Sequence, residues 1–339
     1  MQSDLAARFQ RFAERAGTSP LYQQLAFRIA EDPVVLRMAS EARSVPATTL
    51  FMAAIQSLLL EGADHSLRLF YPNLTPEPRP SADAYPHFRS FCQEHEARIV
   101  EILETRRTQT NEVRRCSYLA LGLAVVARRA LRFSLIDAGA SAGLHLLWRR
   151  FGYCYDGERF GDESSPVQIP CAMRGRGRPP FPDGWPEPLE QVGIDLHPLN
   201  ACDPQHRIWL KALIWPENKE RSELLDRALS IASLYPPRVF AGDVFGLLPE
   251  LIERMPDNTP VCVCHSHVMN QFSEADRSRF DTLLMRLASG RDIYRLAAEW
   301  LGTQTTEFTL SRYRDGGKTH GVLALVDDHG AWIRWTDEI

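Results

Sequence analysis

The stretch Gly139-Ala140-Ser141-Ala142-Gly143 spaces small residues in a way that serves two kinds of chemistry. Glycine adopts positive φ values and has no Cβ, so a loop of this composition brings its backbone close to a ligand. In one interpretation, a nucleotide-type cofactor lies across the loop. In the other, the G-x-S-x-G spelling is a nucleophile elbow, and Ser141 is the nucleophile of a serine hydrolase.

The order of residues along the chain permits the hydrolase interpretation, but the context is unfavourable. Asp243 and His265 or His267 follow Ser141 in an order that such enzymes use. A nucleophile elbow, however, lies in a sheet that earlier strands have begun, and an upstream loop completes its oxyanion hole. No strand is predicted before Phe133, and there is no upstream His-Gly-Gly segment. The sequence therefore favours a cofactor, with the hydrolase as the alternative.

The elements around this loop predict an α/β fold. After Phe133, short apolar runs alternate with helical stretches, as in a series of βαβ units. The predicted parallel strands are 133–137, 191–196, 238–241, 261–265 and 293–297. The strands predicted to complete the sheet in antiparallel orientation are 308–313, 320–326 and 331–335. Ligands bind outside the carboxyl ends of parallel strands, where Asp137, Asp195, Asp243 and residues 265–267 would gather.

Two further segments flank this predicted sheet. Residues 1–130 show the three- and four-residue spacing of helices, which predicts an N-terminal helical subdomain or cap before a sheet domain at 131–339. An insertion at 152–190 is rich in Pro and Gly and begins with a predicted hairpin around Asp156-Gly157. We expect this insertion to be a flap that closes over a substrate together with the helical region.

The polar stretch 106–115 precedes a strongly apolar helix and has two compatible interpretations. Thr110 or Asn111 could cap that helix, because short polar side chains accept hydrogen bonds from the free amides of the first turn. Alternatively, the segment folds over the glycine loop and presents Gln109, Asn111 and Glu112 to a cofactor or substrate.

The end of the predicted strand 261–265 offers candidate catalytic groups. His265 or His267 could act as a general base, because imidazole titrates near neutral pH. A role as a helix cap or backbone partner is the alternative for each. Cys262 and Cys264 share one face of the strand, which suggests buried packing rather than metal binding. The seven cysteines contain no C-x-x-C pair, and no metal site is predicted.

Composition limits the classes of partner. The 339 residues are 44% hydrophobic and carry a formal net charge of -4, which predicts a globular protein and no nucleic-acid partner. No apolar run is long enough to span a membrane, and the N-terminus lacks a signal-peptide core, so we expect a cytoplasmic protein. The expected partner is a small-molecule substrate. The sequence makes no prediction of the oligomeric state.

The Asp-x-Gly-x-Ser-x-Gly loop at 137–143 resembles the first motif of class I S-adenosylmethionine-dependent methyltransferases, with Ser141 replacing a middle glycine. Residues 193–198 and 241–245 resemble the second and third motifs. The resemblance implies a Rossmann-like, methyltransferase-type sheet with S-adenosylmethionine as cofactor. Asp195 would bind the ribose, Asp243 and the Val244 amide the adenine, and Asp137 the ammonium group. The implied cofactor-binding residues are Asp137, Gly139, Ser141, Gly143, Asp195, Asp243, Val244 and Ser266.

At a finer level, the chain from about residue 85 onward resembles the domain-of-unknown-function 2332 family of bacterial proteins. The motifs that carry this resemblance are Thr108-Gln109-Thr110-Asn111-Glu112-Val113, Gly139-Ala140-Ser141-Ala142-Gly143-Leu144, Gly193-Ile194-Asp195-Leu196, Ile214-Trp215-Pro216 with Arg221, Gly242-Asp243 and His265-Ser266. That family implies a fold and no activity. Because the loop and strand-end motifs resemble those of methyltransferases, we expect a methyltransferase acting on a small molecule. The alternatives are the serine hydrolase and a non-catalytic protein that binds a nucleoside-like ligand.

Overall fold

The computed structural model describes residues 2–300 and 305–336 and divides the chain into two compact units. The first unit comprises Met1–Thr110 and Asp203–Asp226, and the second comprises Asn111–Cys202 and Arg227–Ile339. The sequence predicts a single boundary near residue 130, whereas the structure divides the chain at other positions. The segment 111–130 belongs with the sheet, and a helical stretch that follows the second parallel strand in sequence belongs with the N-terminal helices.

The described part of the first unit is helical, as its spacing of apolar residues predicts. Its α-helices are α1 (Gln2–Arg15), α2 (Pro20–Ala30), α3 (Pro33–Ala39), α4 (Ala47–Glu61), α5 (Ala84–Glu94), α6 (Glu96–Thr105) and α8 (Pro204–Ala212), with 3-10 turns η1 (Ser66–Phe70) and η2 (Ser81–Asp83). Helix α9 (Lys219–Leu234) begins in this unit and ends in the second. The Gln56 side chain on α4 donates to the carbonyls of Ala212 and Ile214 at 2.9 and 2.6 Å, which fixes the end of α8 against α4.

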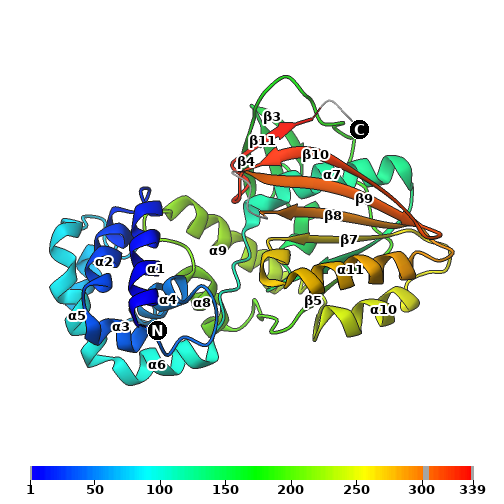
Figure 1. Ribbon diagram of the computed structural model, residues 1–339. Coiled ribbons are helices and arrows are strands. Elements are labelled where there is room, and N and C mark those ends of the chain that lie inside the picture. Colours follow the sequence, from blue (N-terminus) through cyan, green and yellow to red (C-terminus); the bar gives the residue numbers. More distant parts are fainter. Residues whose placement is uncertain (1, 301–304, 337–339) are drawn as a thin grey trace. The chain divides into compact units, whose positions relative to one another are not determined.

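The described residues of the second unit form one eleven-stranded sheet in the order β3-β2-β4-β11-β10-β9-β8-β7-β1-β5-β6 (Figure 1). Strands β6, β5, β1, β7 and β8 are parallel to one another, whereas β9 and β10 are antiparallel to their neighbours. The strands are β1 (Ser134–Ala138), β2 (Gly152–Tyr155), β3 (Glu158–Gly161), β4 (Gln168–Met173), β5 (Gln191–Asp195), β6 (Val239–Ala241), β7 (Val261–Ser266), β8 (Ile293–Glu299), β9 (Thr306–Arg314), β10 (Gly317–Val326) and β11 (Trp332–Trp335).

The fold is therefore the expected mixed α/β type with a large, mostly parallel sheet and antiparallel strands toward the C-terminus. Each of the eight strands predicted after Phe133 is present, with ends shifted by a few residues. The central strands are almost wholly buried, which fits their apolar runs: all five residues of β1 are buried, as are five of the six residues of β7.

The insertion at 152–190 differs in part from its prediction. The hairpin is confirmed: β2 and β3 pair through a turn in which Asp156 and Gly157 have positive φ. The expected flap is instead an extension of the sheet, because β4 pairs with β2 on one side and with β11 on the other. Aromatic rings of the insertion pack together, with Phe160 stacked on Phe181 at 4.4 Å between ring centroids.

Helices cover both faces of the sheet. Helix α7 (Cys116–Arg129) packs on one face, where Gly122 approaches Phe308 and Leu296 so closely that a Cβ would clash. Helices α10 (Val244–Arg254) and α11 (Glu274–Leu287) share a core with Ile136 and Val263, which belong to the other face (Figure 1). Among the described helices, none has the length and apolar character needed to cross a membrane.

Candidate functional site

The sheet has a topological switch point at β1. Strand β5 pairs with one side of β1 and β7 with the other, so the connections that follow these strands diverge and leave a crevice at their carboxyl ends. A small cavity lies there, with a volume of about 10 Å³, close to the minimum for one water molecule. The residues that line it are Arg115, Tyr118, Leu119, Asp137, His145, Cys264, His265, Ser266, Leu296 and Phe308.

Asp137 is the central charged residue of this cavity. Its side chain is buried, and the residue is 2% exposed. The Cys264 thiol donates to Oδ1 at 3.6 Å, whereas Oδ2 has no hydrogen-bond partner among the described residues. His145 Nδ1 lies 3.5 Å from Oδ2, and its other ring nitrogen lies 3.1 Å from the Glu112 carbonyl. A buried carboxylate oxygen without a donor is costly, so this atom is suited to a cationic or hydrogen-bonding ligand.

The glycine loop after β1 is held by bonds within the protein. Gly139, Ser141 and Gly143 all have positive φ, at 83°, 52° and 72°. The amides of Gly139 and Ala140 donate to the Ile194 carbonyl at 2.8 and 3.0 Å. The loop leads into a 3-10 helix, η4 (Leu144–Arg150), rather than an α-helix. The loop is therefore rigid, and its geometry does not offer the free amide row of an α-helix N-terminus.

Asp195 and Asp243, the two predicted adenosine-binding residues, lie at the carboxyl ends of neighbouring strands. The Asp195 carboxylate accepts from the Ser141 amide at 2.8 Å and from the His197 amide at 2.9 Å. Asp243 is exposed and caps α10, which begins at Val244, by accepting from the Phe245 amide at 3.1 Å. The Gly242 amide donates to the Asp195 carbonyl at 2.9 Å, so the two carboxylates share one edge of the sheet.

The segment before α7 lies on the glycine loop, as one interpretation of its sequence predicts. Buried Asn111 accepts a hydrogen bond from the Leu144 amide at 3.0 Å. The cap of the first turn, η3 (Val113–Arg115), is Glu112, which accepts from the Arg114 amide, rather than Thr110 or Asn111. Asn111 and Glu112 therefore position the loop and its neighbour His145, whereas the third predicted residue, Gln109, belongs to the first unit.

His265 has both ring nitrogens in hydrogen bonds. Its Nδ1 lies 2.6 Å from Glu299 Oε1, and Arg295 Nε donates to its Nε2 at 2.9 Å. The arginine cannot accept, so the histidine is the neutral tautomer with its proton on Nδ1. Burial and the charge of Arg295 lower the pKa of His265, against the opposing effect of Glu299. Because both ring nitrogens are in hydrogen bonds, neither is available for the predicted role of general base. The geometry instead fits a role in positioning Glu299.

Glu299, which ends β8, completes this arrangement. Its carboxylate accepts from His265 and also from the amides of Val268 and Met269 at 3.0 and 3.1 Å. Burial alone would raise the pKa of Glu299, but the hydrogen bonds from His265 and from the Val268 amide hold it below its usual range. The carboxylate thereby fixes the turn that follows β7, whose residue Val268 packs against Gly139.

His267 and Ser266 occupy that turn. His267 has a φ of 56°, and within the described residues its Nε2 has no hydrogen-bond partner. Burial and the nearby charge of Arg115 lower the pKa of His267 to about 4, so its ring is neutral at pH 7. The Ser266 hydroxyl lies 3.0 Å from the Tyr118 hydroxyl, on the α7 face of the sheet. His267 Nε2 thus makes no hydrogen bond among the described residues and lies 4.0 Å from Asp328 Oδ1, and His267 remains a predicted proton acceptor.

We expect His267→Asn to reduce the acid sensitivity of folding. An unfolded histidine has a pKa near 6.5, whereas folded His267 has a pKa of about 4. Between these two values the unfolded chain binds more protons than the folded chain, so the free energy of unfolding decreases as the pH is lowered. The wild type should lose about 2 kcal/mol more than the variant between pH 7 and 4.5. Urea unfolding at both pH values measures this, with exposed His197→Asn as control. Parallel losses in wild type and variant would contradict the assignment. Asparagine tolerates the positive φ.

Sequence reasoning missed Glu299, Arg295, His145 and Tyr118 as members of this site. Glu299 ends the fifth parallel strand, two residues beyond the predicted end at 297, so the rule that selected Asp137 would have found it. Arg295 and Tyr118 lie within a strand and a helix whose sequences read as packing elements, and they carry no local signal. His145 follows the loop in a turn that was expected to be helical.

The sequence also draws attention to two cysteines of the strand 261–265 and to the possibility of a metal site. Cys262 and Cys264 are buried in β7, as their spacing on one strand face predicts, and burial raises the pKa of both thiols. No group of three or more His, Cys, Asp or Glu suited to a metal ion occurs among the residues that the structure describes.

Comparison with known proteins identifies a family for this chain. The model of a family described as uncharacterised proteins conserved in bacteria, DUF2332, matches residues 6–335. No curated protein and no solved structure matches the chain. The match spans nearly the whole sequence, including the helical N-terminal region that the motifs did not reach. The chain therefore belongs to the domain-of-unknown-function 2332 family of bacterial proteins.

Proposed function

We propose that this protein binds S-adenosylmethionine at the carboxyl ends of β1, β5 and β6 and transfers its methyl group to a small molecule. The observation that carries the proposal is the buried Oδ2 of Asp137 at the switch point, which accepts no hydrogen bond among the described residues and has His145 Nδ1 3.5 Å away. An ammonium group of the cofactor would satisfy this oxygen, because a buried carboxylate is stabilised by a charged donor.

The neighbouring strand ends support the same ligand. Asp195 and Asp243 are acceptors at the ends of β5 and β6, in the order in which a ribose diol and an adenine amino group would follow the ammonium group. A carboxylate offers about four acceptor positions, which suits the two hydroxyls of a ribose. Gly139 is exposed, and a Cβ there would meet Val268. The loop and the turn after β7 thus form the wall against which the methionine part would lie.

The chemistry proposed for this site rests on positioning. Bound S-adenosylmethionine supplies an electrophilic methyl group on a sulfonium, which an oxygen or nitrogen of the substrate attacks as the bond from methyl to sulfur breaks. The loop, whose Gly139 and Ala140 amides are bound to the Ile194 carbonyl, would orient the cofactor, and orientation is the main source of acceleration proposed for the transfer. His267 Nε2, which makes no hydrogen bond among the described residues, would accept the proton that the nucleophile releases.

Calorimetric titration with S-adenosylmethionine and its demethylated product tests the proposal. We expect Asp137→Asn and Asp243→Ala each to weaken cofactor binding about tenfold or more, because each removes a charged acceptor. Asp257→Ala, at a carboxylate whose side chain is 96% exposed, is the matched control. Thermal unfolding of each variant separates loss of the site from loss of the fold. Appearance of the demethylated product with a small-molecule nucleophile then reports methyl transfer.

The outcomes separate this proposal from the alternatives. Absence of heat with either compound, together with labelling by a fluorophosphonate that Ser141→Ala abolishes, would overturn it in favour of a serine hydrolase. Binding that survives Asp137→Asn and Asp243→Ala unchanged would also overturn the assigned contacts. Binding without any methyl transfer would favour a non-catalytic protein that recognises the nucleoside.

A further inference from the structure

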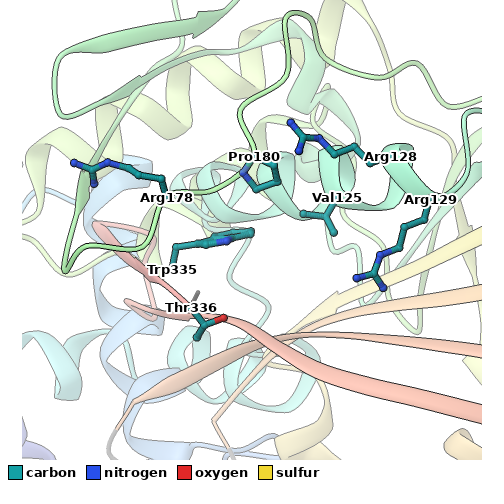
Figure 2. A pocket seen from close by; sticks show the side chains of 7 residues that line it. All are labelled: Val125, Arg128, Arg129, Arg178, Pro180, Trp335 and Thr336. Atoms are coloured by element: carbon teal, nitrogen blue, oxygen red, sulfur yellow. The ribbon is translucent and has the colours of Figure 1, made fainter. Parts of the chain in front are cut away.

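A second pocket lies in the second unit, away from the switch point. It has a volume of about 350 Å³, within the range of sites for small molecules. Its lining comes from the end of α7, the loop after β4 and the end of β11 (Figure 2). The residues that line it are Val125, Arg128, Arg129, Arg178, Pro180, Trp335 and Thr336.

Three arginines give this pocket its charge. Arg128, Arg129 and Arg178 are all exposed, and within the described residues no hydrogen bond or ion pair is recorded for any of their guanidinium groups. The carboxyl end of α7 favours cations and accounts for part of the placement of Arg128 and Arg129. It does not account for Arg178, which reaches the same pocket from a separate loop. Figure 2 shows Arg178 on one side of the Trp335 ring and the other two on the opposite side.

The floor of the pocket is held firmly. Trp335 is 4% exposed and pairs with Ala324 at the end of β11. The hydroxyl of the next residue, Thr336, donates to the carbonyls of Val322 and Leu323 at 2.6 and 2.9 Å. The buried indole ring and the Thr336 hydrogen bonds therefore fix the floor, beside which the exposed arginine side chains can meet an anionic group.

We propose that this pocket binds a small phosphate-bearing anion that carries two or more negative charges. Guanidinium forks match phosphate oxygens in pairs, and these three, which have no acidic partner among the described residues, concentrate positive charge on a chain whose net charge is -4. Helix α7 has 14 residues and a length of about 20 Å. Its first residues border the switch-point cavity and its last residues border this pocket, so the two sites are distinct.

Calorimetric titration of the full chain with inorganic pyrophosphate and with ADP tests the site. We expect Arg128→Gln and Arg178→Gln each to weaken ADP binding about fivefold, and the double variant about 20-fold or more, because each removes a charged hydrogen-bond donor. Arg176→Gln, at an exposed arginine of the same loop outside the lining, is the matched control and should bind like the wild type. Pyrophosphate should also bind and should lose affinity in the same variants, because the arginines contact phosphate oxygens.

Several outcomes would overturn the site. Unchanged ADP binding in the double variant would do so, as would an equal loss in Arg176→Gln, which would indicate a general charge effect. Tighter binding of a short DNA duplex than of ADP, with the steep salt dependence of phosphate-backbone contacts, would assign the arginines to a nucleic acid instead. Loss of ADP binding in Asp243→Ala, but not in Arg178→Gln, would place the nucleotide at the switch point.

Discussion

We expect Glu299→Ala to lower the free energy of unfolding by about 4 kcal/mol, because each of three buried donors would lose its acceptor at a cost of about 1–3 kcal/mol. The Glu299 carboxylate is 8% exposed at the residue level and accepts from the ring of His265 and from two backbone amides. Alanine would leave these donors buried without acceptors, and each unsatisfied donor costs free energy. The turn after β7, with His267, should also lose its fixed position.

Urea unfolding at pH 7 measures this loss. Glu307 faces Glu299 across β8 and β9 but is exposed, so Glu307→Ala is a matched control and should change stability by less than about 0.5 kcal/mol. Glu299→Gln keeps the shape and one acceptor oxygen, and its loss should fall between those of the two alanine variants. If Glu299→Ala and Glu307→Ala unfold at the same urea concentration, the carboxylate does not hold the turn.

Gly330→Ala is expected to destabilise the protein by about 3 kcal/mol, since two separate costs add at this residue. Gly330 has a φ of 77°, which side chains other than glycine rarely adopt. A Cβ there would also meet the backbone of Arg114 and would lie 2.9 Å from the Arg115 nitrogen. Backbone atoms cannot move aside as a flexible side chain could, and the Ser117 hydroxyl already donates to the Gly330 carbonyl at 3.2 Å.

A second glycine isolates the conformational part of this cost. Gly316, in the turn between β9 and β10, has a φ of 82° and nothing within 4 Å of an added Cβ. Gly316→Ala should therefore cost only about 1 kcal/mol. Thermal and urea unfolding of both variants give the comparison. Equal losses would mean that the close approach to Arg114 contributes nothing, and that the β10–β11 turn is free to move from the start of α7.

The strands could be predicted from the sequence because each is a short apolar run that ends at a residue with a clear signal. Asp137, Asp195 and His265 mark the ends of β1, β5 and β7 within one residue. The pairing of β4 with β11 could not be predicted in this way, because these strands are far apart in the sequence and β4 is half exposed. A local pattern predicts that a strand forms, whereas its partners depend on the whole sheet.

The candidate site was predictable to a similar extent. The resemblance to cofactor-binding motifs selected Asp137 and Asp195, and both lie at the switch point. It did not reveal that the Asp195 carboxylate accepts from the Ser141 amide, because a contact between residues 54 positions apart leaves no trace in either local segment. The direction of His265 was equally hidden. The two-residue alternation in β7 turns its ring toward Phe280 on α11, away from Asp137 and Ser266.

The two outermost strands of the sheet bear on how the folded protein behaves at high concentration. An exposed sheet edge is a template on which another chain can add a strand, and long, flat, apolar edges promote aggregation. Here one edge is β3, of four residues, which begins with exposed Glu158 and Arg159, and the other is β6, of three residues. Charged and very short edges give an incoming strand few hydrogen bonds. Both edges of the eleven-stranded sheet therefore disfavour the addition of a strand from another molecule.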